Sequence, residues 1–223
     1  MHPIQSKIVK LLMHTSVQTY AQLRPEGVES NHFAYHLDQL VKDGLVAKLD
    51  RGYTLTSAGL AHADRVSHET MAVRVQPHLV TTVVITNDTG QTLLFRHTFQ
   101  PYLDKVGVPQ GRIHYGELVA EAASRELEEK TSLKGIELTH RGIVYITTTK
   151  HGVDISRFLT HVFSGAAHGA PDVHTEKAAD GVPFWGDAAS YSPAQCMPGF
   201  PDIQRLLRES TGLFFAELTA EMA

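Results

Sequence analysis

Residues 111–133 read GRIHYGELVAEAASRELEEKTSL, which predicts a glycine turn leading into an amphipathic helix. The expected buried side of the helix consists of residues at helical spacing: Leu118, Ala122, Ala123 and Leu127. Glu126 and Glu129 lie three positions apart, so their carboxylates share one side of the helix. Carboxylates gathered in this way repel one another unless a cation binds them. Mg²⁺ bridged to a phosphate is the cation that fits this pattern.

The glycines ahead of the helix complete this pattern. Gly111 and Gly116 can adopt positive φ and let a phosphate come close to the backbone. Glu121 and Arg125 are four positions apart and are predicted to pair. The stretch therefore predicts a phosphate-binding turn followed by a group of metal-binding carboxylates.

The flanking sequence predicts an α/β domain. Residues 79–85, LVTTVVI, indicate a buried strand, and residues 91–97 return from a turn as its partner. Two further strands and an amphipathic helix are expected at residues 142–150, 156–165 and 201–210. The last stretch, residues 213–223, is apolar enough to pack on a partner or on another domain of the chain.

The same residues resemble a known family. Their spacing follows the Nudix box, G-x5-E-x7-R-E-U-x-E-E-x-G-U, in which U is a bulky aliphatic residue. The positions that fall on its register are Gly111, Glu117, Arg125, Glu126, Leu127, Glu129 and Leu133. The resemblance covers residues 79–223 and implies the Nudix fold, an α/β/α sandwich around a mixed sheet.

Nudix proteins typically hydrolyse a nucleoside diphosphate linked to another group, with Mg²⁺ or Mn²⁺ as cofactor. The resemblance implies that Glu126 and Glu129 bind the metal and that Glu126 can act as the base that orients water. Arg125 would orient these carboxylates. Glu117, with Gly111, would support the geometry of the loop and helix.

The substrate pocket is less well marked. Trp185 resembles an aromatic residue that frames this pocket in the family. Phe184 and Trp185 could stack on a base of the substrate, or they could pack in the core. The sequence does not identify the compound that binds.

Two positions depart from the Nudix box, because Lys130 replaces its last Glu and Ser132 its last Gly. Lys130 is four positions from Glu126 and is predicted to pair with it. An ammonium there would compete with the metal, so we expect weaker metal binding and slower turnover. Glu176 and Asp154 are candidates for a replacement ligand.

Residues 1–70 predict a second, mainly helical domain. The expected elements are a helix ending near Ser16, a short helix at residues 20–23, a helix from Ser30 or Asn31 to Gly44, a β-hairpin at residues 45–56, and a helix from Ser57. This order resembles the winged helix-turn-helix, a small α+β domain. Residues 71–78 lose the helical pattern and are the expected linker.

The resemblance to a winged helix-turn-helix implies contacts with double-stranded DNA through the third helix and the wing. The implied contacts to bases are Asn31, His32, Tyr35 and Gln39, and those to phosphates are Lys42, Lys48 and Arg51. Residues 1–70, however, carry seven basic and seven acidic side chains. Because DNA affinity depends on phosphate neutralisation, dimerisation or protein docking is the alternative role.

His32 and His36 offer a further alternative. They lie four positions apart on the third predicted helix and could bind zinc. The sequence shows no third ligand, so we interpret both as surface or partly buried residues.

Composition places the protein in a broad class. The 223 residues are 42% hydrophobic and 20% charged, with a net charge of −4, which argues against a general polyanion binder. The single cysteine, Cys196, excludes an internal disulfide and a cysteine-based zinc site. We find no signal peptide and no apolar run that could span a membrane, and expect a cytoplasmic protein without a membrane partner.

Three functions fit these observations. The first is a metal-dependent Nudix hydrolase with a DNA-binding winged helix. The second is a transcriptional regulator, in which a weak or inactive Nudix domain senses a nucleotide metabolite. In regulators of this kind the Nudix part comes first, whereas here the order is reversed. The third is a hydrolase that the winged helix only dimerises. Binding to a palindromic operator would require a homodimer.

Overall fold

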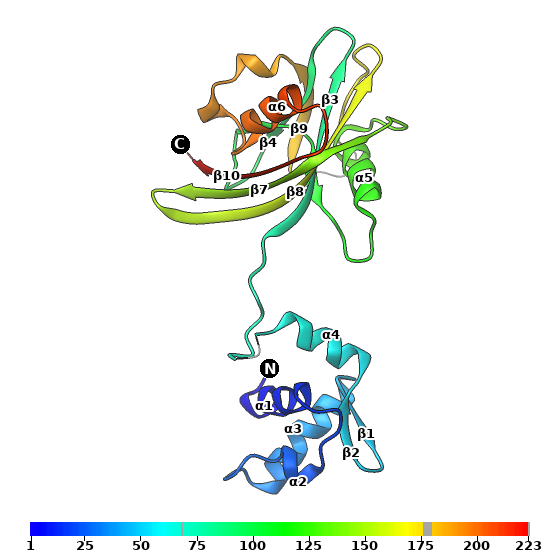
Figure 1. The fold of residues 1–223 in the computed structure, drawn as a ribbon, viewed down its shortest axis with the longest axis vertical. Helices are drawn as coiled ribbons and strands as arrows, with labels where there is room; N and C mark the ends of the chain where they lie inside the picture. Colours follow the sequence, from blue (N-terminus) through cyan, green and yellow to red (C-terminus); the bar gives the residue numbers. More distant parts are fainter. Residues whose placement is uncertain (68, 176–179, 223) are drawn as a thin grey trace. The chain divides into compact units, whose positions relative to one another are not determined.

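The computed structural model describes residues 1–67, 69–175 and 180–222. The chain folds into two compact units, Met1–Gln76 and Pro77–Ala223, each with a hydrophobic core of its own (Figure 1). Among the described residues, no helix combines the length and the apolar character needed to cross a membrane.

The N-terminal unit follows the order of elements expected from its sequence. Its elements are α1 (Pro3–Met13), α2 (Tyr20–Leu23), α3 (Ser30–Lys42), β1 (Val46–Leu49), β2 (Gly52–Leu55) and α4 (Ser57–Arg65). The predicted cap of the third helix was wrong, because Glu29 is the N-cap and makes no side-chain cap hydrogen bond. The amide of Phe33 donates to the carbonyl of Glu29, which places Ser30 inside the helix.

The core of this unit lies between α1 and α3. Most of its side chains come from these two helices, and Leu23 of α2 and Val46 of β1 add to them; the set is Ile8, Val9, Leu12, Leu23, Phe33, Leu37, Leu40 and Val46. Burial of this apolar stripe stabilises both helices. The opposite side of α3 is left at the surface, where Tyr35 is 60% exposed.

The C-terminal unit contains one mixed sheet. Its elements are β3 (His78–Asn87), β4 (Thr92–His97), β5 (Val106–Gly107), β6 (Gln110–Arg112), α5 (Val119–Thr131), β7 (Thr139–Lys150), β8 (Val153–Ala167), β9 (Gly181–Gly186), α6 (Phe200–Glu209) and β10 (Phe214–Glu221). The strand order is β10-β7-β8-β3-β4-β5, with β6 paired to β3 and β9 paired to β4. The β3–β8 and β10–β7 pairs are parallel, and the other pairs are antiparallel.

Two helices cover opposite faces of this sheet. Neighbouring residues on a strand point to opposite faces. Ile85 of β3 packs in one core cluster with Leu127 of α5, whereas Val84 packs in another with Ile203 of α6. Figure 1 shows the two helices on either side of the strands. The unit is therefore an α/β/α sandwich with a mixed sheet, as the sequence predicted.

The end of the chain differs from its prediction. Instead of an apolar tail for a partner or another domain, β10 forms an edge strand that pairs with β7 over its whole length. Its residues alternate between half-buried and exposed, and Phe215 is 67% exposed. The alternating pattern of residues 214–221 is that of a strand with one face on a core.

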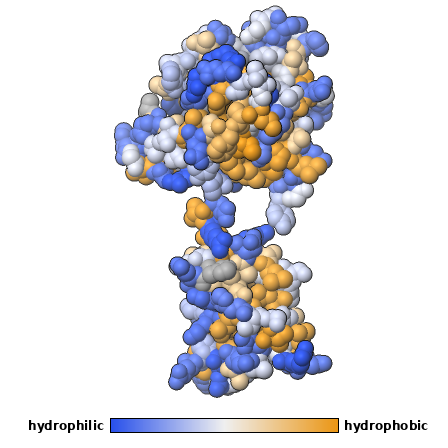
Figure 2. All heavy atoms as spheres, viewed as in Figure 1, coloured by the Kyte–Doolittle hydropathy of each residue, from blue (hydrophilic) through white to orange (hydrophobic). Residues whose placement is uncertain are grey.

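The loop before α5 also differs from its prediction. Leu118 was expected on the buried side of the helix, but it is the N-cap of α5 and is 67% exposed. Tyr115, in the same loop, is 98% exposed. Figure 2 shows further apolar side chains gathered in orange areas on the visible face of each unit. The apolar pattern of residues 118–127 therefore predicts burial about one turn before the buried side of the helix begins.

Candidate functional site

Gly111 lets the α5 helix come close to the sheet. It lies in β6 opposite Thr81 of β3, and a Cβ atom at this position would lie 1.7–2.2 Å from the carboxyl atoms of Glu126. Only glycine leaves room for that carboxylate. Of the two glycines that could adopt positive φ, Gly116 does so in the loop, with φ +85°, whereas Gly111 lies in a strand and does not.

Arg125 holds the carboxylates of the loop and helix together. Its Nε and Nη2 donate to the two oxygens of Glu117 at 2.7 and 3.0 Å. Its Nη1 donates to Glu126 Oε1 at 2.7 Å and to Glu129 Oε2 at 3.4 Å. We call Glu117, Glu126 and Glu129, with Arg125, the acidic cluster. One guanidinium fixes three carboxylates, because its planar donors point in several directions.

The backbone supports the same arrangement. Arg125 Nη2 also donates to the carbonyl of Arg112 at 2.9 Å, and the amide of His114 donates to Glu117 Oε2 at 2.9 Å. The predicted pair between Glu121 and Arg125 does not form. Glu121 instead accepts from the amide of Leu118 at the start of α5, at 3.3 Å.

These contacts shift the pKa values of side chains in the acidic cluster. The hydrogen bonds from Arg125 and from the His114 amide lower the pKa of Glu117 to about 2. The hydrogen bond to Glu117 is in turn the main cause that raises the pKa of Arg125. Glu117 is therefore a fixed anion, and the side chain of Glu126 is 9% exposed beside it.

Lys130 has a different partner from the one predicted. It is 6% exposed, and its ammonium pairs with Asp180, at the start of β9, rather than with Glu126. The same ammonium lies 5.0 Å from the centroid of the Phe95 ring. The amide of Thr98 donates to the Asp180 carbonyl at 3.1 Å and holds this residue beside β4. We call Lys130 and Asp180 the lysine pair.

His97 lies next to the lysine pair. Burial, and then the charge of Lys130, lower the pKa of His97 to about 4, against an opposing effect of Asp180. Its ring is therefore neutral near pH 7. Among the described residues, none gives a hydrogen-bond partner to His97 Nε2 or to Asp180 Oδ1, and both atoms are buried.

A cavity of about 570 Å³ joins the two groups. Its charged lining comes from Arg112, Glu126, Lys130 and Asp180, and its aromatic lining includes Phe99, Tyr102 and Phe158. Gly111 and His97 also line it. The lining of this cavity thus combines carboxylates, cations and aromatic rings on which a ligand can stack.

The family follows from a comparison of the sequence. The model of the NUDIX domain matches residues 76–195, which is more than half of the chain. The chain belongs to the NUDIX domain family. Members of this family generally use divalent metal ions. A comparison with curated proteins gave no match.

One solved structure of a NUDIX domain shares the fold, and a second is less similar. The NUDIX domain of Shewanella oneidensis NrtR, complexed with ADP ribose, is 16% identical, with a TM-score of 0.53 over 70% of this chain and 98% of that domain. The MutT protein from Bacillus halodurans is 19% identical, with a TM-score of 0.49 over 64% of this chain and 89% of that one. At this identity the likeness shows the fold alone.

The acidic cluster of this NUDIX domain fits a divalent cation. Mg²⁺ and Mn²⁺ prefer oxygen ligands, and carboxylates are the protein ligands that they take most often. Glu126 and Glu129 offer such oxygens from one side of α5. Asp180 Oδ1, a buried oxygen that accepts no hydrogen bond from the residues the structure describes, lies in the same cavity. The sequence did not single out Asp180, because it lies 50 residues from Lys130 and in no motif.

The other described residues that the sequence suggested for the substrate or the metal lie outside this cavity. Phe184 and Trp185 do not line this cavity: Trp185 packs on the core beside α5 and donates to the Pro171 carbonyl at 2.9 Å, and Phe184 packs on the core beside α6. Asp154 pairs with Arg157 at 2.5 Å, also outside the cavity lining. Glu176 lies outside the described residues. These placements favour the core-packing alternative for the two aromatic residues.

The candidates for DNA contact lie on the N-terminal unit. The exposed ones are Asn31, His32, Tyr35 and Lys42 on α3, with Lys48 and Arg51 on the hairpin. Gln39 is half-buried. The structure therefore leaves most of these side chains accessible on one helix and one hairpin.

Proposed function

We propose that the NUDIX domain hydrolyses the pyrophosphate of a nucleoside diphosphate linked to another group, with Mg²⁺ or Mn²⁺. The observation that carries this proposal is the acidic cluster, which Arg125 fixes beside a cavity of about 570 Å³. A cavity of this size accommodates a ligand of that class.

The reaction adds the oxygen of water to one phosphorus atom. The bond from that phosphorus to the bridging oxygen breaks, and the bridging oxygen leaves on the other phosphate. Glu126 is placed to take the proton of the water as a base. A divalent cation held by Glu126 and Glu129 supplies charge neutralisation when it is bound.

Other side chains of the cavity bind and orient the substrate. Lys130 and Arg112 present cations toward phosphate oxygens, and the aromatic rings suit a base or sugar. Asp180, rather than Glu126, is the carboxylate that pairs with Lys130. Because this pair offsets the charge of the ammonium, we expect Lys130 to compete less with the metal than the sequence suggested, which favours an active enzyme over an inactive sensor.

A matched pair of variants tests the proposal. Purified full-length protein is assayed with a panel of nucleoside diphosphate derivatives, ADP-ribose included, with and without Mg²⁺. We expect Glu126→Gln to lower kcat at least about 100-fold, the scale of a lost base. Glu128→Gln is the control, because Glu128 lies on the same helix and pairs with Lys134 at 2.7 Å at the surface.

The outcomes separate the functions. Turnover that Glu126→Gln removes and Glu128→Gln keeps supports a hydrolase. No turnover with any compound, together with thermal shifts on ligand addition, would overturn the hydrolase and favour a sensor.

We further propose that the N-terminal unit is a winged helix-turn-helix that binds double-stranded DNA as a homodimer. The exposed polar side of α3 and the exposed cations of the hairpin support this role. Fluorescence anisotropy with operator candidates should show binding that weakens as salt rises. No binding at low salt, with a dimer present in solution, would assign dimerisation as the role of this unit.

A further inference from the structure

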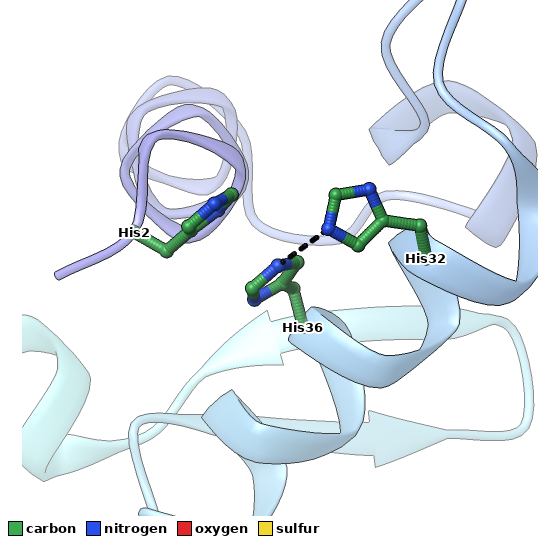
Figure 3. Close-up of side chains that lie close together, drawn as sticks. All are labelled: His2, His32 and His36. Carbon is green, nitrogen blue, oxygen red and sulfur yellow. Dashed lines mark hydrogen bonds between the residues drawn. The ribbon is translucent and has the colours of Figure 1, made fainter.

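Three histidines meet in the N-terminal unit, far from the acidic cluster in sequence. His2 is the N-cap of α1, and His32 and His36 lie one turn apart on α3. Their ligand nitrogens all lie within 4.8 Å of one another. Figure 3 shows the rings of His32 and His36 pointing toward each other, with the ring of His2 beside them. We call these residues the histidine cluster.

The spacing of two of these nitrogens matches a shared metal ion. His32 Nε2 and His36 Nε2 are 3.1 Å apart. Two ligands on one tetrahedral zinc, at about 2.0–2.1 Å from the metal, are about 3.3 Å apart. The i, i+4 spacing on a helix therefore holds this pair close to the separation that an ion requires.

His36 is the buried member of the histidine cluster. It is 7% exposed, and among the described residues none gives its buried Nδ1 a hydrogen-bond partner. An ion on His36 Nε2 would leave the proton of this ring on Nδ1. Burial, and then the neighbouring rings of His2 and His32, lower the pKa of His36.

We propose that His2, His32 and His36 bind one divalent transition-metal ion of the Zn²⁺ class, with a fourth position open to water. Three imidazoles are ligands for Zn²⁺, Ni²⁺, Cu²⁺ or Co²⁺, whereas Mg²⁺ prefers oxygen. The site is thus chemically distinct from the acidic cluster of the NUDIX domain. It supplies the third ligand that the sequence did not reveal.

Binding requires one movement. The rings of His2 and His36 are stacked, with centroids 3.9 Å apart and planes 10° apart. A metal lies near the plane of each ring that binds it, so the His2 ring must tilt. The amide of Ile4 donates to His2 Nδ1 at 3.3 Å, and this long hydrogen bond is lost when the ion binds either nitrogen. Ligation by Nε2 needs the proton on Nδ1, and ligation by Nδ1 displaces the donor.

The ion would tie the start of α1 to α3. His32 is also a candidate for contact with DNA and lies beside Asn31 on the same helix. Metal binding should therefore raise the melting temperature of the N-terminal unit, because only the folded state brings the three rings together.

The test uses full-length protein without a histidine tag. Glu126→Gln and Glu129→Gln are introduced first, so that the acidic cluster contributes little to metal binding. Zn²⁺ affinity is measured in competition with a chromophoric chelator, and Co²⁺ absorption reports the coordination. His2→Gln, His32→Gln and His36→Gln are compared with His14→Gln, a histidine next to α1 that is outside the cluster.

We expect one Zn²⁺ per chain and a visible Co²⁺ spectrum of tetrahedral type. Each cluster variant should lose at least about tenfold in Zn²⁺ affinity, since loss of even an outer partner costs 10–100-fold. His14→Gln should bind as the parent does. No binding by the parent, or unchanged affinity in His2→Gln or His32→Gln, would overturn the three-histidine site. These two residues are exposed, so both variants stay informative if His36→Gln fails to fold.

Discussion

The acidic cluster, through Glu126, and the lysine pair both line one cavity, yet they are assembled in different ways. The cluster joins a loop and a helix that are neighbours in sequence, and Arg125 reaches Glu117 only eight positions away. The lysine pair joins residues 50 positions apart, from α5 and the start of β9. Local geometry can specify the first group, whereas the second depends on how the sheet places β4 and β9.

The largest effect should come from removing the centre of the acidic cluster. Arg125→Ala frees three carboxylates, and a displacement of catalytic groups by about 1 Å costs about 100-fold in rate. We therefore expect kcat to fall at least about 100-fold, as measured in the assay of the preferred substrate. Arg157→Ala, which removes an exposed pair with Asp154, is the control and should keep its activity.

Gly111→Ala would test the close approach of helix and strand. The new methyl group overlaps the carboxyl group of Glu126, and overpacking of this kind costs about 1–3 kcal/mol. Urea unfolding should show this loss together with lower activity. Gly212→Ala is the matched control, because a Cβ there meets no atom within 4 Å. Equal stability of the two variants would show that Glu126 moves freely away from β6.

Lys130→Met would break the lysine pair. It leaves the Asp180 carboxylate without its cation, in a site where one of its oxygens has no hydrogen-bond partner within the described part of the chain. Breaking a fully buried pair costs about 3–5 kcal/mol, and the 32% exposure of the Asp180 side chain lowers this to about 1–2 kcal/mol.

The double variant Lys130→Met/Asp180→Asn sharpens this result, because it removes both charges. It should be more stable than the sum of the two single changes predicts, which urea unfolding of all four proteins measures. In the same series the pKa of His97, followed by NMR, should rise above about 4 when Lys130 is replaced. Additive free energies would show that the lysine pair does not couple α5 to β9.

The last prediction concerns the dependence of stability on pH. The pKa of Glu117 is about 2 in the folded protein, below its ordinary value of 4.5. Glu117 therefore contributes stability that is present above pH 4.5 and is lost as the pH falls toward 2. Unfolding free energies of wild type and Glu117→Gln should converge over this window. A constant difference between them would contradict the low pKa.

The sequence predicted the residues of the acidic cluster because their positions are fixed by spacing along a loop and a helix. The register of Gly111, Glu117 and Arg125 was enough to place Glu126 and Glu129 together. The sequence was misleading where a residue outside the helix replaced a helical neighbour as the partner of a charged side chain. Glu117 displaces Glu121 as the partner of Arg125, and Asp180 displaces Glu126 as the partner of Lys130.

The sequence predicted the histidine cluster only in part, for the same reason. The i, i+4 pair of His32 and His36 was visible in the sequence, but His2 was not, since it reaches them only when α1 packs on α3. The final strand was missed for a related reason. The alternation of residues 214–221 indicates a strand, but its parallel partner, β7, lies about 70 residues away, and only the tertiary structure shows which strand it joins.

The sequence by itself therefore determined the family, the α/β/α class of the second unit and the residues of the acidic cluster. These depend on hydrophobic period and on fixed spacing within about 20 residues, which the chain carries wherever it folds. Only the tertiary structure decided the partner of Lys130, the neutral state of His97 and the third ligand of the histidine cluster. Each of these depends on burial and on contacts between distant segments, because desolvation and charge pairing act through space rather than along the chain.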